Sequence, residues 1–398
     1  MRVAVVHHWF VTRGGGERVA ECIAALFPQA ELFTLVASPS GLPETLIHRR
    51  LHTSFLQRLP LAQTYHRNFL PFYPSATHSL DLRGFDLVLS SDSGPVKGVR
   101  LDPGATHICY CHSPMRYLWD GYDQYRADMS LPVRAAFTLV APRIRRWDRA
   151  AAQRVTFFLA NSRYVADRIE RCYDRASEVI HPPIDLHRAA SLTAEIPGDH
   201  YLCAGRLVSY KRTDLLIEAC RSLGRKLRIL GTGPEESRLR RLADGDPLIE
   251  FLGERNTRDW WIEYARCRAL LFAADEDFGM VPLEAQACGR PVIAYGAGGS
   301  LETVRGTGPQ PTGAYFRKQT AASAASAIQS WESAGEQQFD PAFARDWAAT
   351  FATPIFLDRY RSFVLQHVHQ AASQAISAEA AAAVVCPDEP TLSQEVIR

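Results

Sequence analysis

Short apolar runs recur along the chain and are separated by segments with helical spacing of apolar residues. In order, the runs are VAVV, LFTLV, DLVLS, HICYC and TFFLA, followed by YLCAG, LRILG, IEFLG, LLFAA and PVIAY. Continuous apolar strands that alternate with helices are typical of parallel sheets covered on both faces, because such strands are buried on either side. The ten runs therefore predict an α/β fold with two doubly wound domains.

The length of the chain supports this division, because 398 residues exceed one ordinary hydrophobic core. Residues 179–200 contain three prolines and little periodicity, which indicates a linker between domains. We expect a first domain over 1–187, a second over 188–350, and a C-terminal helix with a polar tail over 351–398. The last ~10 residues are expected to fray, as chain ends commonly do.

Charge and cysteine content narrow the class of protein. Lys and Arg total 45 against 43 Asp and Glu, so the net charge gives no support for a nucleic-acid partner. The nine cysteines are odd in number and mostly lie in apolar runs, which predicts buried thiols in a reducing compartment. Cys109 and Cys111 lack a second pair, so a zinc site is not expected.

The sequence also predicts a cytoplasmic location. The N-terminus, MRVAVVHHWF, starts as a strand and has neither the basic segment nor the cleavage site of a signal peptide. No run of about 18 apolar residues is present, so a membrane-spanning helix is not expected.

The stretch EDFGMVPLE, residues 276–284, follows an apolar strand and opens a helix. Pro282 suits the first helical position, which would place Glu284 in the first turn and Glu276 in the preceding loop. Doubly wound domains bind ligands at such strand ends, where a helix N-terminus attracts phosphate or hydroxyl oxygens. An alternative is that Glu284 only complements the helix dipole.

A second strand, loop and helix occur at CAGRLVSYKRTDLLIEAC, residues 203–220. Arg206 and Lys211 lie in this loop, and cations at a helix start oppose its dipole, so a structural reason for both is weak. A diphosphate suits the pair. The alternative interpretation is that both are solvated surface residues. No HExxH or EF-hand pattern is present, so these cations are expected to replace a metal in neutralising a leaving phosphate.

Two further strand exits carry candidate residues. In FVTRGGGERVAECIAALF, residues 10–27, three glycines allow close backbone approach, but neither a P-loop nor a dinucleotide fingerprint is matched, which disfavours a nicotinamide enzyme. In HICYCHSPMRYLWD, residues 107–120, His112 is followed by Arg116, Trp119 and Asp120. A lone histidine at a strand end is more often structural, but the crowding of polar and aromatic groups favours a functional interpretation of His112.

Together these segments resemble the family-4 retaining glycosyltransferases of the GT-B architecture. EDFGMVPLE matches the family's E-x7-E motif, GRLVSYK its diphosphate-binding motif, and RGGGE its N-terminal glycine loop, over a resemblance that spans about residues 1–365. Within the family, YCHSPMRYLWD, ANSRYVADRI, VIHPPID and VPLEAQACGRPVIAYGAGGSLETV resemble the O-antigen and exopolysaccharide mannosyltransferase branch.

The resemblance implies two Rossmann-like domains that face a cleft, with the nucleotide on the second domain and the acceptor on the first. Arg206 and Lys211 would bind the donor diphosphate, and Glu284 the ribose. Glu276 and His112 would lie against the transferred sugar. The resemblance also implies that backbone N–H groups bind sugar and phosphate oxygens of the donor, at Gly15, Gly16, Gly279, Met280 and Val281. The nucleobase would lie at the segment that begins with Phe251. Acceptor-side candidates are Arg116, Trp119 and Asp120.

The function implied is retaining transfer of a hexose, mannose from GDP-mannose, to a glycan or lipid-linked oligosaccharide in bacterial surface polysaccharide synthesis. No metal or other cofactor is expected. The alternatives are a UDP-sugar donor, a nucleotide-sugar epimerase on the same architecture, and a sugar-nucleotide-binding protein without catalysis. His8 departs from the branch, which more often has an acidic residue there, and the loop SSDSGPVKGV also differs.

Residues 131–154 carry six arginines and one acidic residue among Val, Phe, Leu, Ile and Trp. Such a basic amphipathic stretch suits an anionic membrane surface at the inner face, where a lipid-linked acceptor would be met. The alternative is an ordinary solvated helix face. Pro142 is expected to interrupt any single long helix here.

Overall fold

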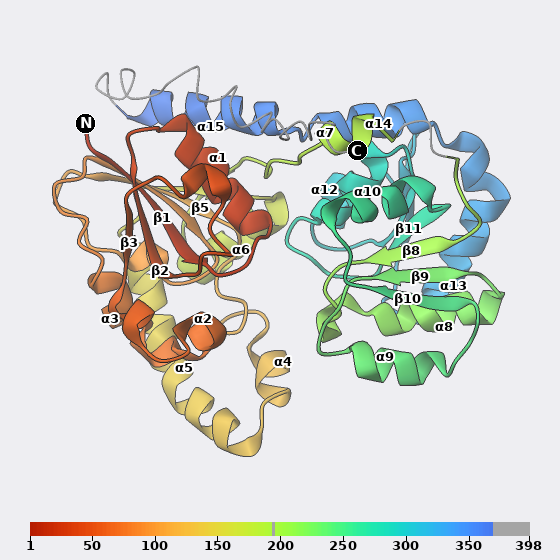
Figure 1. Ribbon diagram of the computed structural model, residues 1–398, viewed down its shortest axis with the longest axis horizontal. Helices are drawn as coiled ribbons and strands as arrows, with labels where there is room; N and C mark the ends of the chain where they lie inside the picture. The colour runs from red at the N-terminus through yellow and green to blue at the C-terminus, as the bar shows by residue number, and fades with distance from the viewer. Residues whose placement is uncertain (193–195, 369–398) are drawn as a thin grey trace, which may run out of the picture.

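The computed structural model describes residues 1–192 and 196–368, which form two lobes side by side (Figure 1). Each lobe is built on one sheet whose strands are all parallel. This arrangement confirms the α/β class and the two doubly wound domains predicted from the apolar runs.

The sheet of the first lobe has the strand order β3-β2-β1-β4-β5-β6-β7. Its strands are β1 (Val3–Phe10), β2 (Glu31–Ala37), β3 (Leu51–Thr53), β4 (Leu87–Asp92), β5 (Thr106–Cys111), β6 (Phe157–Ala160) and β7 (Ser177–Val179). Its helices are α1 (Gly15–Leu26), α2 (Ala62–Tyr65), α3 (Tyr73–His78), α4 (Tyr122–Ala127), α5 (Leu131–Ala152) and α6 (Arg163–Tyr173).

The sheet of the second lobe has the strand order β10-β9-β8-β11-β12-β13. Its strands are β8 (Tyr201–Ala204), β9 (Leu227–Leu230), β10 (Ile249–Gly253), β11 (Ala269–Phe272), β12 (Val292–Tyr295) and β13 (Gly313–Phe316). The helices of this half of the chain are α7 (His187–Ala190), α8 (Thr213–Leu223), α9 (Glu236–Ala243), α10 (Thr257–Arg266), α11 (Met280–Ala287), α12 (Ser300–Thr303), α13 (Ala321–Ser330), α14 (Pro341–Ala349) and α15 (Thr353–His367).

Both faces of each sheet are covered, which is why its strands are continuously apolar. In β1, Val3 and Val5 belong to the core on one face, whereas Ala4 and Val6 belong to the core on the other. The eight cysteines among the described residues are buried and free.

The last helix returns to the first lobe. Phe356, Tyr360 and Phe363 of α15 are buried in the same core cluster as Val3 and Ile23, so α15 packs against the first sheet and α1 (Figure 1). The chain therefore crosses between the lobes twice, and these crossings lie next to each other because Ile184 pairs with Ala352. The rest of the predicted C-terminal helix and its polar tail, residues 369–398, lie outside the described residues.

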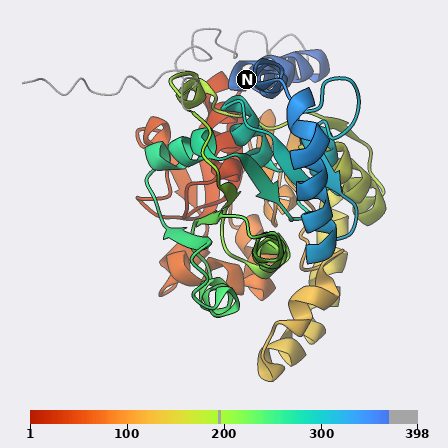
Figure 2. The ribbon, with the colours of Figure 1, turned by 90° about the vertical axis from the view of Figure 1, so that its right-hand side faces the viewer.

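Helices α4 and α5 project from the body of the first lobe in both ribbon views (Figures 1 and 2). The predicted interruption at Pro142 is wrong, because α5 runs unbroken through this residue. A proline inside a helix costs about 3 kcal/mol through a lost hydrogen bond and a clash. Burial of Phe137, Ala141 and Ile144 against Tyr73 opposes that cost, since these side chains form one apolar cluster.

Candidate active site

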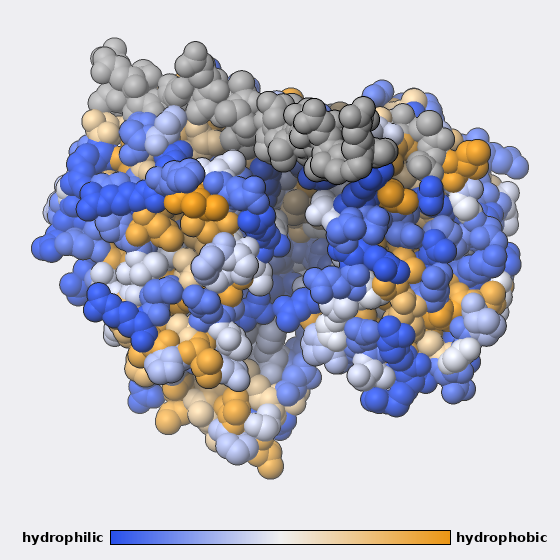
Figure 3. Space-filling model, in the orientation of Figure 1, coloured by the Kyte–Doolittle hydropathy of each residue, from blue (hydrophilic) through white to orange (hydrophobic). Residues whose placement is uncertain are grey.

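The carboxyl ends of the strands in both sheets open towards the space between the lobes, and Figure 3 shows this space as a hollow in the molecular surface. Ligands of doubly wound domains bind outside these strand ends. The segments after β1, β5 and β6 of the first lobe contact the second lobe through Gly15, Arg116 and Ser162. Their partners lie after β8, β11 and β12, and include Tyr210, Asp277 and Glu302.

Lys211 and Glu276 form an ion pair in the second lobe. Lys211 ends a 3-10 turn, Ser209–Lys211, that follows β8, and Glu276 lies in the loop after β11. Their side chains are only 14% and 17% exposed. Burial opposes the charge of Lys211, but the Glu276 carboxylate outweighs it and raises the pKa of Lys211 above its ordinary value. Lys211 is therefore a fixed cation at the strand ends.

Arg206 lies on the same loop and is exposed. Among the described residues, no carboxylate pairs with its guanidinium, so its donors are available to an anion. A small cavity that Arg206 and Lys211 share reaches down to Cys203 and Thr213. This loop thus carries the unpaired guanidinium of Arg206 and the ion-paired ammonium group of Lys211, which together suit two phosphates of one ligand.

The loop between β11 and α11 ends at Gly279, whose φ of +85° lies in the left-handed region that favours glycine. The helix begins at Met280, so the prediction that Pro282 takes the first helical position is wrong. Pro282 is the third residue of the helix, where its missing N–H still costs no intrahelical bond. Glu284 consequently lies in the second turn rather than the first.

Glu284 is half-buried and accepts a hydrogen bond from the hydroxyl of Tyr264 at 2.8 Å. Burial raises the pKa of Glu284, and the Tyr264 hydrogen bond and the charge of Lys211 oppose that effect. The Tyr264 hydroxyl fixes one carboxylate oxygen. The other oxygen remains able to accept a hydrogen bond from a ligand hydroxyl.

His112 follows the last residue of β5 and faces the glycine loop. Its Nε2 lies 2.8 Å from the Ser91 hydroxyl, and the side-chain amide of Asn161 donates to its carbonyl at 3.0 Å. A Cβ added at Gly16 would lie 3.6 Å from His112 Nε2. Burial lowers the pKa of His112 to about 3, with a further contribution from His8. The imidazole is therefore neutral at neutral pH and is not a proton donor to a leaving group.

The glycine loop also meets the second lobe. A Cβ added at Gly15 would lie 2.6 Å from the sulfur of Met280, so the first turn of α1 and the first turn of α11 approach as closely as glycine permits. The structure thus brings together Gly15, Gly16, His112 and Met280 from the two lobes.

The acceptor-side candidates differ in their surroundings. Arg116 reaches the second lobe, where its Nη1 lies 3.8 Å from an oxygen of Asp277 and its guanidinium lies over the Tyr210 ring. The polar groups of Trp119 and Asp120 are engaged within the first lobe instead, since the Trp119 indole donates to Asp148 and Asp120 pairs with arginines of α6.

The candidate nucleobase residue Phe251 lies inside β10 rather than beyond its end. Its ring packs under the guanidinium of Arg240 at 4.5 Å and against the core on the α8 side of the sheet.

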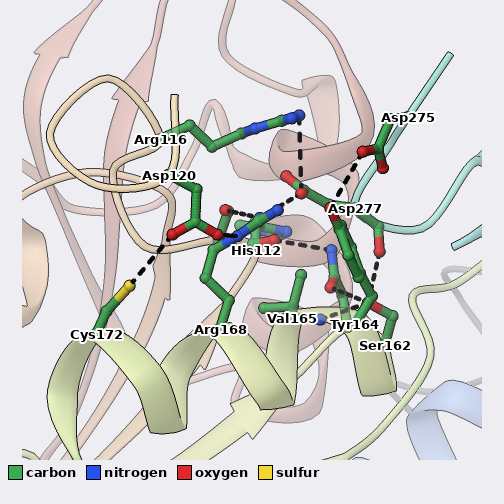
Figure 4. A network of polar contacts seen from close by, with 12 residues as sticks. His112, Arg116, Asp120, Ser162, Tyr164, Val165, Arg168, Cys172, Asp275 and Asp277 are labelled. Atoms are coloured by element: carbon green, nitrogen blue, oxygen red, sulfur yellow. Dashed lines mark hydrogen bonds and ion pairs between the residues drawn. The ribbon is translucent and has the colours of Figure 1, made fainter. Parts of the chain in front are cut away.

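The sequence reasoning missed the contacts that join the lobes (Figure 4). Arg168 of α6 donates to Asp277 at 2.5 Å, and the Ser162 hydroxyl donates to the Asp277 carbonyl at 2.5 Å. A signal for Arg168 existed, because it shares the buried face of α6 with Val165 and Ile169. A buried arginine requires a partner, but the sequence does not show which residue that is.

A second contact between the lobes centres on Glu302 of α12. Its carboxylate accepts hydrogen bonds from the backbone N–H groups of Arg163 and Tyr164 at the start of α6, and lies 3.0 Å from His181 Nε2. Burial alone would raise the pKa of Glu302. The hydrogen bonds from His181 and the two backbone groups outweigh it and hold the pKa below its ordinary value of 4.5.

Comparisons with protein families give two consecutive matches. The family model described as Glycosyltransferase Family 4 matches residues 13–188, and the model described as Glycosyl transferases group 1 matches residues 197–341. The two matches correspond to the two lobes and together cover most of the chain.

Curated relatives match over shorter segments. A GDP-mannose-dependent monoacylated alpha-(1-6)-phosphatidylinositol monomannoside mannosyltransferase of Corynebacterium glutamicum is 40% identical over 123 residues, which is 26% of this chain and 30% of the relative. A D-inositol 3-phosphate glycosyltransferase of Saccharomonospora viridis is 32% identical over 171 residues, which is 35% of this chain and 40% of the relative. The matched segments thus span less than half the length of these relatives.

Solved structures agree over the whole fold. Anabaena Alr3699/HepE, solved in complex with UDP and glucose, superimposes with a TM-score of 0.65 at 17% identity and covers 92% of this chain and 99% of its own. The sucrose-phosphate synthase tll1590 of Thermosynechococcus elongatus gives the same TM-score, identity and coverage. At this identity the likeness concerns the fold, and the fold is that of two-lobed glycosyltransferases.

Proposed function

Because the chain belongs to the family-4 glycosyltransferases, we propose that it transfers a hexose with retention of configuration, most specifically mannose from GDP-mannose, to a glycan or lipid-linked oligosaccharide. The observation that carries this proposal is the pairing of Lys211 with Glu276 beside the free guanidinium of Arg206. Two cations beside a carboxylate match a donor with a diphosphate and a sugar.

In the proposed reaction, the bond between the anomeric carbon and the diphosphate oxygen breaks, and its electron pair stays on the diphosphate. Arg206 and Lys211 stabilise this developing negative charge, so the proposal requires no metal. The acceptor hydroxyl forms its bond to the anomeric carbon on the face that the diphosphate leaves. Its proton passes to the leaving phosphate, so no enzyme base is needed.

The remaining side chains bind and orient. Glu284, held by Tyr264, accepts hydrogen bonds from the ribose hydroxyls, and Glu276 contacts the transferred sugar. His112 is neutral and lies beside Gly16, so in this proposal it contacts the sugar near the reacting carbon without exchanging a proton. The first turn of α11 offers N–H groups at Met280 and Val281 that an α-helix leaves unpaired, which suits phosphate oxygens.

Mannose and GDP are supported by the relative from Corynebacterium glutamicum, whose description names a GDP-mannose-dependent mannosyltransferase. The likeness of the sequence motifs to the O-antigen and exopolysaccharide branch supports an acceptor in surface polysaccharide synthesis.

We further propose that the projecting helix α5 rests on an anionic membrane surface, where a lipid-linked acceptor is available. No helix in the described part of the chain has the length and apolar character needed to cross a bilayer. On α5, however, Leu131 and Leu139 are 75% and 66% exposed. Exposed Arg143, Arg146 and Arg149 lie on the same helix, and Figure 3 shows hydrophobic residues gathered at this end of the lobe. Apolar side chains with arginines suit binding to anionic lipids.

The proposed function is tested by incubating the protein with GDP-mannose and lipid-linked glycans. Release of GDP that requires acceptor, with an α-linked mannose in the product by NMR, is the expected result, since the donor is itself α-linked. Conversion of the donor to another nucleotide sugar without acceptor would instead identify an epimerase. Binding without any turnover would identify a sugar-nucleotide-binding protein.

A further inference from the structure

The loop that carries Glu276 is held from the opposite lobe at the very next residue. Ser162, which caps the N-terminus of α6, donates its hydroxyl to the backbone carbonyl of Asp277 at 2.5 Å. Arg168, further along α6, donates to the Asp277 carboxylate, also at 2.5 Å. One helix of the first lobe therefore grips both the backbone and the side chain of Asp277 (Figure 4).

The guanidinium of Arg168 is also held by side chains of its own lobe. The Arg168 side chain is 1% exposed, its Nε donates to Asp120 at 2.9 Å, and its Nη1 donates to the Ser113 hydroxyl at 2.7 Å. Both of these partners belong to the first lobe. A guanidinium with this many directed contacts has one orientation, so it presents a rigid donor to the second lobe.

The second lobe holds the same loop by its backbone. The N–H of Gly299 donates to the carbonyl of Glu276 at 2.8 Å, and a Cβ at Gly299 would lie 2.2 Å from the Cα of Phe278. The loop is thus clamped between two lobes. Within the second lobe the loop also has the ion pair of Glu276 with Lys211 and the buried side chain of Phe278. Separation of the lobes would therefore remove the support of Asp277 in particular.

We propose that Arg168 is a positioning residue for glycosyl transfer, because it orients the Asp277 loop so that Glu276 faces the transferred sugar only when the lobes are closed. This inference rests on the proposed function. The diphosphate contacts of Arg206 and Lys211 come from the second lobe alone, so nucleotide binding does not depend on Arg168. Turnover does, because it needs the loop in its closed orientation.

The contact of Glu302 with α6 allows the effect of Arg168 on the loop to be separated from an effect on docking of the lobes. Glu302 accepts hydrogen bonds from the start of α6 at 2.8 and 3.3 Å, and none of these bonds involves Arg168 or Asp277. A variant of Arg168 therefore keeps this second contact and the Ser162 bond to the Asp277 backbone, while it frees the Asp277 carboxylate from Arg168.

The test compares Arg168→Gln, Arg168→Lys and Asp277→Asn with Arg171→Gln as the matched control. Arg171 lies on the same helix and pairs with the same Asp120 at 3.1 Å, but it does not contact Asp277. GDP affinity is measured by calorimetry, and kcat and KM are measured for transfer from GDP-mannose. Misplacement of a reacting group by about 1 Å can cost about 100-fold in rate.

We expect kcat to fall about 10- to 100-fold in Arg168→Gln and Asp277→Asn, with GDP affinity within about twofold of the wild type. Arg168→Lys keeps the positive charge but loses the two-pronged donor geometry of the guanidinium. Its kcat should therefore lie between those of the wild type and Arg168→Gln. Arg171→Gln should behave as the wild type. The double variant Arg168→Gln with Asp277→Asn should be no slower than either single variant, because both remove one interaction.

Unchanged kcat in Asp277→Asn, a parallel loss of GDP affinity, or losses that add in the double variant would each overturn the inference. Asp277 is partly exposed at 22%, so Asp277→Asn carries the test if Arg168→Gln does not fold. A wild-type protein that neither binds nucleotides nor transfers sugar would refute the proposed function and this inference with it. Wild-type transfer with full activity in the variants would refute the inference alone.

Discussion

Replacing Lys211 and Arg206 in turn separates their structural and catalytic contributions. Lys211 is paired with Glu276, and its loss leaves a carboxylate that is only 17% exposed without its cation. A hydrogen bond to a charged group contributes about 1.5–3 kcal/mol to stability. At about 2–4 °C per kcal/mol, Lys211→Met should lower the unfolding temperature by roughly 3–12 °C. Arg206 is exposed and has no such partner in the described part of the chain, so Arg206→Ala should change stability by no more than about 0.5 kcal/mol.

Activity should respond differently from stability. Loss of one group that stabilises transition-state charge costs about 100- to 1000-fold in kcat, and we expect this loss for both variants. The assay is acceptor-dependent release of GDP, alongside thermal unfolding of the ligand-free proteins. Met keeps most of the lysine stem, so the change in packing is small.

The double variant Lys211→Met with Glu276→Gln provides the control. Removing the unpaired carboxylate should restore the unfolding temperature, because no charge remains buried without a partner, while activity should stay low. Two results would refute the reasoning. Near-normal transfer by Lys211→Met would contradict the assignment of Lys211 to the diphosphate. A loss of stability in Arg206→Ala as large as that in Lys211→Met would show that the Arg206 guanidinium has a structural partner and is not available to a ligand.

Three further outcomes follow from other contacts. The folded-state pKa of Glu302 is depressed, so its carboxylate stabilises the fold above pH 4.5, and this stability is lost as the pH falls through the folded pKa. Urea unfolding should show Glu302→Gln less stable than the wild type at pH 7, with a difference that shrinks below about pH 4.5. A difference that stays constant with pH would contradict a stabilising role of the Glu302 charge. Tyr264→Phe removes the hydroxyl that fixes the Glu284 carboxylate. Calorimetry should show GDP binding weakened about 3- to 10-fold, since that hydrogen bond contributes about 1 kcal/mol. Unchanged GDP affinity would contradict the assignment of Glu284 to the ribose. The double variant Leu131→Ser with Leu139→Ser should keep the unfolding temperature of the wild type, because both side chains are exposed. It should reduce co-sedimentation with anionic vesicles at least about tenfold, with neutral vesicles as the control. Equal sedimentation of the variant and the wild type would show that α5 does not contact the membrane.

The sequence predicts the buried strands well, because a strand that is covered on both faces must be apolar along its length. The three strands that it did not predict, β3, β7 and β13, lie at sheet edges and are short, with polar or small residues such as His52 and Glu178. Pro142 misled the prediction of α5, because local propensity does not include the burial of Phe137 and Ile144 on either side of it.

The site was predictable where the chemistry is local. Arg206, Lys211 and Glu276 lie in loops directly after strands, and the position of parallel strand ends brings such loops to one edge. The contacts between the lobes were not predictable, because Arg168 and Asp277 are 109 positions apart and nothing in either segment specifies the other. The first residue of α11 was also missed, since Gly279 rather than Pro282 sets the helix start through its left-handed backbone.

The most direct test of the account is thermal unfolding of the purified protein with GDP, UDP, ADP and their sugars. A ligand at about 100 times its dissociation constant adds about 2.7 kcal/mol of stability to the folded state. We expect selective stabilisation by GDP and GDP-mannose, and loss of that stabilisation in Lys211→Met. Selectivity for UDP would keep the nucleotide-sugar site and discard mannose. No stabilisation by any nucleotide would contradict the assignment of Arg206, Lys211 and Glu284 to a sugar-nucleotide donor.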